Sequence, residues 1–571
     1  MTRMTSSEAF VESLVAQGVT DIFGIVGSAF MDALDIFEPA GIRFWSVAHE
    51  QAAAHMADGY SRVTGRHGVC IAQNGPGITN FVTAIAAAYW AHSPVVAITP
   101  QTGNMGIEKG GFQETDQMPI FSKITKYQTQ VNRHERIAEQ THRAFTLAMA
   151  ERGPVQLNIP RDNFYGEADY EIREPMVIER SAGGPAAIRA AAEALASATF
   201  PVIMTGGGVV MGDGQMPAKQ LAEYLGAPVV TSYLHNDAFP ASHELACGPL
   251  GYQGSKAAMN IVSQADVILA LGSRLGPFGT LPQHGIDYWP KGARIVQVDI
   301  DHRMLGLVED VAVAIHGDAG LAAEAILGAL QTMEVAAHGN RGERLAEVGA
   351  QKEAWSKELT DWSSSDAVPM APRRALRELE RAMPNNAMVT TDIGNICSVA
   401  NSYLNFDRPN SLFAAMMWGN CGYAFPTAMG AKIGAPGRPA IAYVGDGAWG
   451  MSMAEVMTCV RENIPVVAVV FNNSQWGAEK KNQVDFYDDR YVGTNLENPS
   501  FAEISTSMGG NGIQVSKPDE IGDALNEAVD SDQVTVLEIM TNQELGEPFR
   551  RDALNLPHRL LEKYEKYSHQ D

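Results

Sequence analysis

Two short apolar segments, each ending in polar residues, place the strongest limit on how this chain can fold. Residues 441–444 run into Gly445-Asp446-Gly447-Ala448, and residues 466–471 run into Asn472-Asn473. The intervening residues 453–462 have the pattern of a helix. The order strand, helix, strand predicts a parallel unit, and the ligands of such units gather at the carboxyl ends of the strands.

The polar residues at these two strand ends have the chemistry of a divalent metal site. Asp446 offers a carboxylate oxygen, Asn473 an amide oxygen and Gln475 a backbone carbonyl, which are the hard ligands that Mg²⁺ prefers beside phosphate oxygens. Gly445 and Gly447 allow phosphate to approach the backbone closely. A lone Gly-Asp-Gly is usually a turn, so the prediction depends on the pair of motifs.

The same alternation of apolar strands and helices recurs along the 571 residues. It predicts an α/β protein with three doubly wound parallel-sheet domains. We expect domains at residues 1–182, 183–332 and 366–546, a linker at 333–365 and a charged tail at 547–571. Strands are predicted in these blocks at residues 21–25, 43–47, 68–72, 95–99, 155–159, 201–205, 267–271, 294–300 and 387–391.

Composition excludes several classes of partner. The formal net charge of -24 argues against binding to nucleic acid or to an anionic membrane surface. No run of 18 apolar residues and no signal-peptide pattern occurs in the sequence. The five cysteines are scattered without a CxxC pair, which favours reduced thiols and a cytoplasmic location.

A second set of motifs lies in the first block. Glu50 follows the predicted strand 43–47, and further on come Asn74-Gly75-Pro76-Gly77-Ile78-Thr79-Asn80 and residues 111–116, which include Gln113. Alone, Glu50 reads as an acidic residue that favours a helix N-terminus. Together with the metal motif, this order of segments resembles the thiamine diphosphate enzymes of the acetohydroxyacid synthase family, and the likeness covers essentially the whole chain.

The resemblance gives each block an expected role. The first domain is expected to bind the pyrimidine ring, and the third to bind the diphosphate and Mg²⁺. Glu50 matches the family's glutamate that activates the pyrimidine, a proton relay in a site that excludes water. The resemblance also implies further cofactor contacts, at Asn74, Ile393, Gly394, Asn395, Ile396, Gly419, Asn420, Cys421, Gly445, Gly447, Ala448, Trp476 and Gly477.

Two of these expectations concern the ends of the bent cofactor. The Gly419 carbonyl would face the pyrimidine amino group, and Cys421 would stand as the wedge between the rings, where relatives often have a larger apolar residue. In the family the site forms between the first domain of one subunit and the third domain of another. A homo-oligomer, at least a dimer, is therefore implied, and a tetramer is common among relatives.

The middle block, with Gly206-Gly207-Gly208, Gly272-Ser273-Arg274 and Asp299, resembles the domain that holds FAD in acetohydroxyacid synthase. In other relatives this domain binds an adenine nucleotide or nothing. A glycine run after a strand is as often a turn as a nucleotide cradle. FAD is therefore compatible with the sequence but is not predicted.

Four segments, at residues 108–117, 476–481, 485–494 and 547–553, narrow the resemblance to the desulfonating branch of the family, the sulfoacetaldehyde acetyltransferases. The branch converts sulfoacetaldehyde and phosphate to acetyl phosphate and sulfite. The alternatives are a carboligase or 2-keto acid decarboxylase of the acetohydroxyacid synthase type and a catalytically silent paralogue. The silent paralogue is disfavoured because Glu50, Asp446 and Asn473 are all present.

Two anionic substrates inside an acidic protein require a few well-placed cations. Lys480 and Arg551 are the first candidates, although most Lys and Arg side chains are simply solvated. Gln113 matches a family glutamine near the thiazolium ring, where its amide could contact the substrate oxygen; it could instead satisfy buried backbone.

Overall fold

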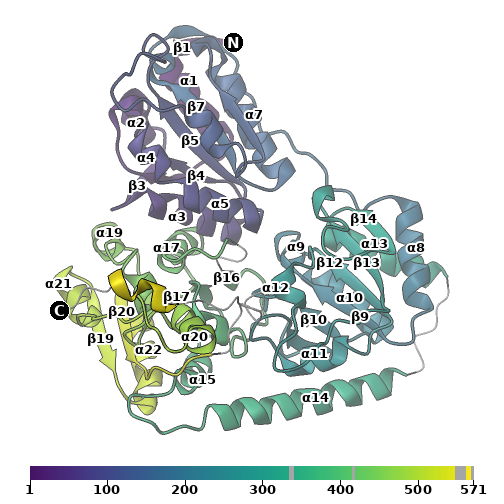
Figure 1. Ribbon diagram of the computed structural model, residues 1–571. Coiled ribbons are helices and arrows are strands. Elements are labelled where there is room, and N and C mark those ends of the chain that lie inside the picture. Colours follow the sequence, from purple (N-terminus) through teal and green to yellow (C-terminus); the bar gives the residue numbers. More distant parts are fainter. Residues whose placement is uncertain (334–339, 415–417, 547–560, 568–571) are drawn as a thin grey trace.

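The computed structural model describes residues 1–333, 340–414, 418–546 and 561–567. It contains three parallel sheets of six strands, each flanked by helices, as the sequence predicts (Figure 1). A helix of 22 residues, α14 (Arg341–Trp362), runs from the middle domain to the third along the bottom of the view. The fold class is therefore confirmed, whereas the domain boundaries stay a prediction.

The first domain carries the purple part of the ribbon in Figure 1. Its sheet has the order β3 (Arg43–Ser46), β2 (Asp21–Gly24), β4 (Gly68–Ile71), β5 (Val95–Gln101), β7 (Val155–Pro160) and β6 (Tyr127–Gln130). A small antiparallel pair joins β1 (Thr2–Thr5) and β8 (Glu167–Tyr170). The helices are α1 (Ser6–Ala16), α2 (Met31–Phe37), α3 (Glu50–Thr64), α4 (Pro76–Thr79), α5 (Val82–Ala91), α6 (Gln117–Phe121) and α7 (Ile137–Glu151).

The middle domain also has six parallel strands, in a different order. Its strands are ordered β11 (Ala246–Pro249), β10 (Val229–Thr231), β9 (Pro201–Thr205), β12 (Val267–Leu271), β13 (Arg294–Asp299) and β14 (Val313–His316). Its helices are α8 (Pro185–Ala196), α9 (Gly207–Met211), α10 (Gln215–Leu225), α11 (Lys256–Val262), α12 (Pro277–Thr280) and α13 (Ala319–Thr332).

The third domain has the strand order β16 (Leu412–Ala414), β15 (Met388–Thr391), β17 (Ala440–Gly445), β18 (Val467–Asn472), β20 (Thr535–Met540) and β19 (Asn511–Val515). Its helices are α15 (Pro372–Ala382), α16 (Asn395–Ala400), α17 (Ala424–Gly434), α18 (Asp446–Trp449), α19 (Glu455–Glu462), α20 (Gly477–Phe486), α21 (Phe501–Ser507) and α22 (Ile521–Asp530). The helix expected at 453–462 thus starts two residues later, after the short turn α18.

Helices α3 and α17 join the first and third domains through one shared hydrophobic core. Their backbones approach so closely that a Cβ on Gly59 would overlap the Thr427 carbonyl, and one on Gly430 would overlap that of Met56. Tyr423 crosses the same contact, donating from its hydroxyl to Asp58 at 2.8 Å. Because these packing atoms are backbone, α3 has little freedom to move relative to the third domain.

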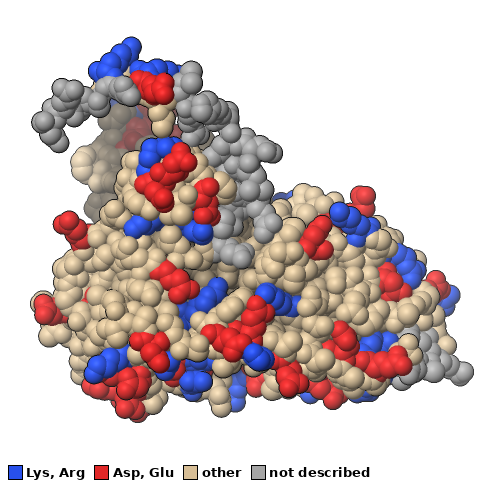
Figure 2. Space-filling model, turned by 60° about the horizontal axis from the view of Figure 1, so that its bottom comes forward, with Lys and Arg blue, Asp and Glu red and all other residues tan. Residues whose placement is uncertain are grey.

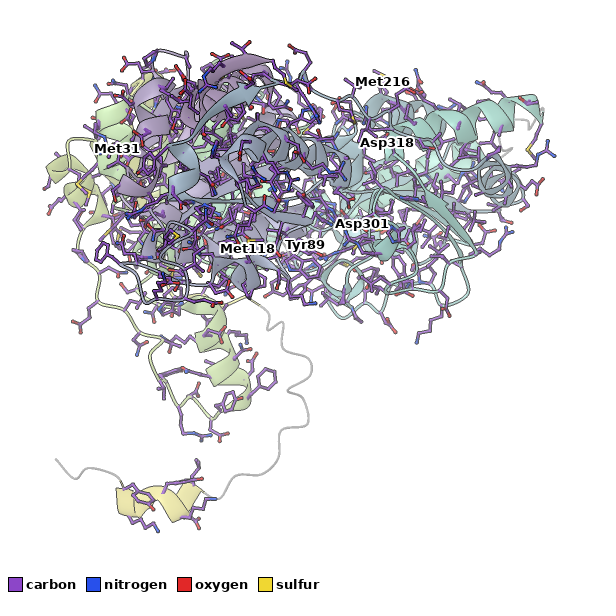
Figure 3. The ribbon with its side chains drawn as sticks, turned by 90° about the horizontal axis from the view of Figure 1, so that it is seen from above. Met31, Tyr89, Met118, Met216, Asp301 and Asp318 are labelled. Atoms are coloured by element: carbon purple, nitrogen blue, oxygen red, sulfur yellow. The ribbon has the colours of Figure 1, made fainter. Side chains whose placement is uncertain are left out.

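The first and middle domains meet at a buried ion pair. Lys126 donates to Asp301 at 2.8 Å, and the two side chains are 1% and 4% exposed. The same ammonium lies 4.7 Å from the ring centroid of Tyr89; Figure 3 labels Tyr89 and Asp301 side by side at this junction. Burial lowers the pKa of Lys126, and its pairing with Asp301 opposes that shift. Breaking either half of such a pair would leave an uncompensated buried charge.

Charged side chains are distributed over the surface. On the face shown in Figure 2, Lys and Arg alternate with Asp and Glu, and the described part of that face has no broad basic patch. Within the described residues, none of the helices combines the length and the apolar character that a membrane span needs.

Candidate active site

The metal motif lies at the carboxyl edge of the third sheet, next to its topological switch point. From β15 the chain goes first to β16 on one side and then to β17 on the other. Asp446 follows β17, and its Oδ2 accepts from the Gln475 backbone amide at 3.3 Å and from Asn498 at 2.8 Å. Asn473 follows β18, which pairs directly with β17. The structure therefore brings Asp446, Asn473 and Gln475 together at one edge of the sheet.

These residues line a cavity of about 390 Å³, within the range of roughly 300–1,000 Å³ that is usual for small-molecule sites. The middle domain contributes an aromatic wall of Tyr233, Tyr252 and Phe278. Most of the predicted cofactor contacts lie in the lining, namely Ile393, Gly394, Asn395, Ile396, Gly419, Cys421, Gly445, Asp446, Gly447, Ala448, Asn473, Gln475, Trp476 and Gly477. Asn74 and Asn420 are not among the lining residues.

The donor set fits a Mg²⁺ ion that shares its ligands with phosphate. Asp446 is 3% exposed, and burial raises the pKa of its carboxyl group while amide hydrogen bonds oppose the shift. The Gln475 side-chain oxygen is buried and has no hydrogen-bond partner in the described structure. Carboxylate, amide and carbonyl oxygens of this kind are ligands that Mg²⁺ takes together with phosphate oxygens.

Asp392 organises the opposite wall of the cavity. Its Oδ1 accepts from the amides of Ile393 at 3.0 Å and Gly422 at 3.1 Å, and its Oδ2 accepts from Ala424 at 3.1 Å. Burial raises the pKa of Asp392 to about 7, with the amide hydrogen bonds acting in the other direction. This carboxyl group fixes the chain on both sides of the cavity. In particular, it holds the backbone immediately after Cys421.

The proposed wedge, Cys421, is a neutral thiol in this setting. Burial raises its pKa to about 12, and the nearby Asp392 and Glu479 carboxylates add to the shift. A thiol that stays protonated is a poor nucleophile, so its surroundings agree with a packing role.

The first domain assembles Glu50, Asn74 and Gln113 in one cluster. The Oε2 of Glu50, the first residue of α3, accepts from Asn80 at 2.8 Å. Asn74 donates to the Gln113 carbonyl at 2.8 Å, and the Gln113 side-chain oxygen accepts from Gln73 at 2.8 Å. The Gln113 side chain thus bonds another side chain and not buried backbone, and its contact with the substrate stays a prediction.

Glu50 and the metal motif do not meet within one chain. Among the described residues, those that line the cavity come from the middle and third domains alone. Because α3 is packed tightly on α17, Glu50 cannot swing to the cavity of its own chain without breaking that core. A single chain thus presents two separated parts of the expected site.

The carboxylate of Glu455, at the start of α19, fixes the backbone just before Glu50. It is 1% exposed and accepts from the backbone amides of Ala48 at 3.1 Å and His49 at 3.0 Å. Thr458 donates to the same carboxylate at 2.6 Å. Sequence reasoning missed this residue, because only the packing of α19 beside the first domain reveals the contact.

Lys480 is buried but lies outside the cavity lining. Its ammonium donates to Asn495 at 2.9 Å and to Gln543 at 3.2 Å, and it lies 5.0 Å from the ring centroid of Tyr491. Gln543 in turn donates to the Asn473 carbonyl at 3.3 Å. In this arrangement Lys480 supports the proposed metal ligand Asn473 indirectly, through Gln543. Arg551, the other predicted cation, lies outside the described residues.

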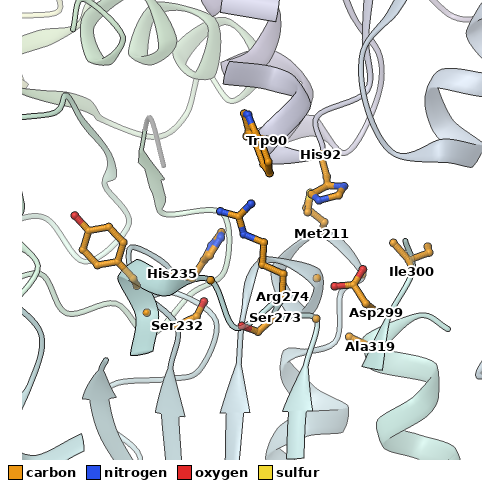
Figure 4. A pocket seen from close by; sticks show the side chains of 18 of the residues that line it. Trp90, His92, Met211, Ser232, His235, Ser273, Arg274, Asp299, Ile300 and Ala319 are labelled. Carbon is orange, nitrogen blue, oxygen red and sulfur yellow. The ribbon is translucent and has the colours of Figure 1, made fainter. Parts of the chain in front are cut away.

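The middle domain has a separate pocket at the carboxyl edge of its own sheet (Figure 4). Its volume is about 130 Å³, and the Arg274 guanidinium lies 4.8 Å from the ring centroid of Trp90 above it. His92, His235 and Asp299 also point toward this space (Figure 4). The volume of the pocket is below the roughly 300 Å³ of the smaller ligand sites, and FAD stays compatible with the sequence without being predicted.

Comparison with known families identifies the class of protein. Three models of thiamine pyrophosphate enzymes match the chain: the N-terminal TPP binding domain over residues 4–120, the central domain over 188–326 and the C-terminal TPP binding domain over 392–539. The fold and the matched domains thus define a three-domain thiamine diphosphate enzyme.

Individual relatives narrow the class. The chain is 60% identical to sulfoacetaldehyde acetyltransferase of Castellaniella defragrans, over 99% of this chain and 98% of that protein. It is 59% identical to the enzyme of the same name from Alcaligenes xylosoxydans xylosoxydans, over the same shares. A probable acetolactate synthase large subunit of Methanocaldococcus jannaschii is 34% identical, over 94% of this chain and 92% of that protein. The chain belongs to the sulfoacetaldehyde acetyltransferase family.

Proposed function

We propose that this protein uses thiamine diphosphate and Mg²⁺ to convert sulfoacetaldehyde and phosphate to acetyl phosphate and sulfite. The observation that carries the proposal is the cavity at the ends of β15, β17 and β18, in a chain that is 60% identical to a sulfoacetaldehyde acetyltransferase. Five free cysteines support a reducing, cytoplasmic location.

Different residues would hold the metal, the diphosphate and the rings of the cofactor. Asp446, Asn473 and Gln475 would hold Mg²⁺ and, through it, the diphosphate. The loop around Gly394, whose φ of 131° suits glycine, would offer backbone amides to the phosphate oxygens. When bound, thiamine diphosphate supplies a nucleophilic carbon and an electron sink for the substrate. Cys421 would support its bent shape.

The second half of the site comes from another copy of the chain. Glu50 lies outside the cavity of its own chain, and a homodimer is the smallest assembly that brings Glu50 of one subunit to Asp446 of the other. There the Glu50 carboxyl group would hold and pass a proton at the pyrimidine ring, with Asn80 orienting it. A tetramer built from two such dimers is the form that we expect.

One assay tests the reaction. Purified protein with thiamine diphosphate, Mg²⁺, sulfoacetaldehyde and phosphate should release sulfite and form acetyl phosphate in equal amounts. Leaving out phosphate should stop acetyl phosphate formation. Release of carbon dioxide and acetolactate from pyruvate, without sulfite from sulfoacetaldehyde, would instead identify a carboligase of the acetolactate synthase type.

A hybrid dimer tests the composite site. Subunits carrying Glu50→Gln and subunits carrying Asp446→Ala are each expected to be inactive alone. In a hybrid of the two, one site keeps both Glu50 and Asp446, so about half of the wild-type activity per dimer should return. A hybrid without activity would show that both residues must belong to the same chain.

A further inference from the structure

The proposed reaction poses a chemical problem that loss of carbon dioxide does not. A 2-keto acid loses its carboxylate group as carbon dioxide. Sulfoacetaldehyde has instead a hydrogen on its carbonyl carbon. That C–H bond must break and its proton must go to a base. The inference below rests on the proposed function, because only an aldehyde substrate requires this base.

The balance of the step is complete without an external oxidant. The proton of the aldehyde carbon goes to the base, and the C–H electron pair moves toward the neighbouring carbon. The C–S bond of that carbon then breaks, and its electron pair leaves with sulfite. A proton is next added to the neighbouring carbon to make the methyl group. Phosphate forms the new C–O bond as its own O–H bond breaks, and the proton of that bond leaves with sulfite or passes to water. The aldehyde carbon is oxidised and its neighbour is reduced.

Few groups in the half of the site that the middle and third domains form can act as this base, and in the proposed dimer Glu50 of the other copy serves the cofactor. Among the described lining residues, the only carboxylates are Asp446 and Glu479. Asp446 is occupied by the metal in the proposed site. Burial raises the pKa values of the Cys421 thiol and of the Tyr233 phenol to about 12, so both stay protonated near neutral pH. The remaining hydroxyl side chains of the described lining are those of Tyr252 and Ser398.

Glu479 lies in the right part of the cavity. It is in the first turn of α20, three residues beyond Trp476 and on the side of Cys421, whose thiol is close enough to respond to the Glu479 charge. Asn482 donates to its Oε2 at 3.3 Å and orients the carboxylate. The Cys421 end of the cavity is where the cofactor rings are expected, whereas Asp446 marks the diphosphate end.

The negative charge of Glu479 also bears on its role. Both substrates are anions, so a carboxylate in their cavity opposes binding. A side chain at this place that served binding alone would be neutral or cationic. Glu479 is exposed and lies in the first turn of α20, where a carboxylate also favours the helix N-terminus, so its assignment rests on its place in the cavity lining.

We propose that Glu479 is the general base that removes the proton from the aldehyde carbon of the substrate, and that it then returns a proton to the neighbouring carbon as sulfite leaves. The residue acts on the substrate and not on the pyrimidine ring. Its role is thus separate from that of Glu50, which serves the cofactor.

The experiment compares Glu479→Gln with wild type in the holoenzyme. Trp418 and Trp476 line the cavity, so quenching of tryptophan fluorescence reports binding of thiamine diphosphate with Mg²⁺. This binding and the exchange of the cofactor carbon-2 proton should both stay within about twofold of wild type. Sulfite release should fall at least ~100-fold, the lower end of general acid–base contributions.

Deuterium on the aldehyde carbon separates a chemical role from a structural one. In Glu479→Gln the deuterium isotope effect on sulfite release should rise above the wild-type value, because proton removal becomes the slow step. Asp485→Asn is the matched control: it removes a carboxylate from the same helix, where Asp485 pairs with Lys481 at 2.6 Å outside the cavity. This variant should release sulfite at the wild-type rate.

The outcomes are distinct. Wild-type sulfite release by Glu479→Gln, or a slower release without a larger isotope effect, overturns the assignment of Glu479. Absence of sulfite release by the wild-type protein contradicts the proposed function itself.

Discussion

The third and middle domains are both built on six-stranded parallel sheets, but their strand orders differ and they use the carboxyl edges of these sheets in opposite ways. In the third domain, a Cβ built on Gly394 or Gly445 meets no atom within 4 Å, so these glycines face the open cavity. In the middle domain, a Cβ on Gly208 or Gly272 would overlap the backbone of the other glycine. There the glycines bring two strand ends together. A glycine-rich sheet edge can therefore bind a phosphate group only where the space beside its glycines is open and not filled by neighbouring backbone.

The largest difference between the two edges is expected when a carboxylate is removed from each and the affinity for thiamine diphosphate is measured. Asp446→Ala takes a proposed ligand from the metal and should weaken Mg²⁺-dependent binding of thiamine diphosphate at least ~100-fold, since even outer partners of metal ligands matter ~10–100-fold. Asp299→Ala removes a carboxylate beside the middle pocket and should leave that affinity within about twofold. Tryptophan fluorescence titration measures both. Equal losses in the two variants would contradict the distinction between the edges.

The first domain adds a function that neither edge provides. Glu50→Gln keeps the side-chain volume and the Asn80 partner, so the fold and cofactor binding should survive. Exchange of the cofactor carbon-2 proton for deuterium, followed by NMR, should slow at least ~100-fold because the carboxyl relay is lost. Exchange at the wild-type rate would remove Glu50 from the mechanism.

Local pattern was sufficient for the elements and for much of the cavity. The strands at Pro201–Thr205 and Val267–Leu271 have the predicted bounds, because continuous apolar runs between turn residues leave little choice. Asp446 and Asn473 were predicted to converge, because parallel strands end at one edge. The family matches over all three domains agree with the resemblance read from the motifs.

Contacts between domains escaped the sequence. Tyr233 and Phe278 reach the cavity from the middle domain, and nothing in their local sequence points to the third domain. Glu455 contacts residues that are more than 400 positions away. The roles of Gly208 and Gly272 depended on which backbone faces them, which only packing decides. Within the third domain, the Lys480 ammonium donates to two amide oxygens, and its contact with the substrates stays a prediction.

A glycine-to-alanine substitution at each edge separates a role in binding the cofactor from a role in packing. Gly445→Ala has open space and an ordinary φ of -75°, so the free energy of unfolding should change by less than about 0.5 kcal/mol. The affinity for thiamine diphosphate should nevertheless fall ~10-fold, since a methyl group hinders an anion hydrogen-bonded to the backbone. Gly208→Ala should do the reverse, with a loss of about 1–3 kcal/mol in stability and unchanged affinity. Urea unfolding and titration of the folded protein provide the two measurements.

The smallest expected effect concerns the link between the third domain and Glu50. In Glu455→Gln, the side-chain amide would turn an N–H toward the Ala48 or His49 amide and leave a buried donor without a partner. Stability should fall by about 1–3 kcal/mol. Carbon-2 exchange should slow a few-fold while cofactor affinity is unchanged, because Glu50 is displaced and the diphosphate edge is not. The control is Glu462→Gln on the same helix, where a surface pair with Arg43 at 3.3 Å is lost at a cost below ~1 kcal/mol. If the control slowed exchange equally, the effect would belong to the contact of α19 as a whole and not to the Glu455 carboxylate.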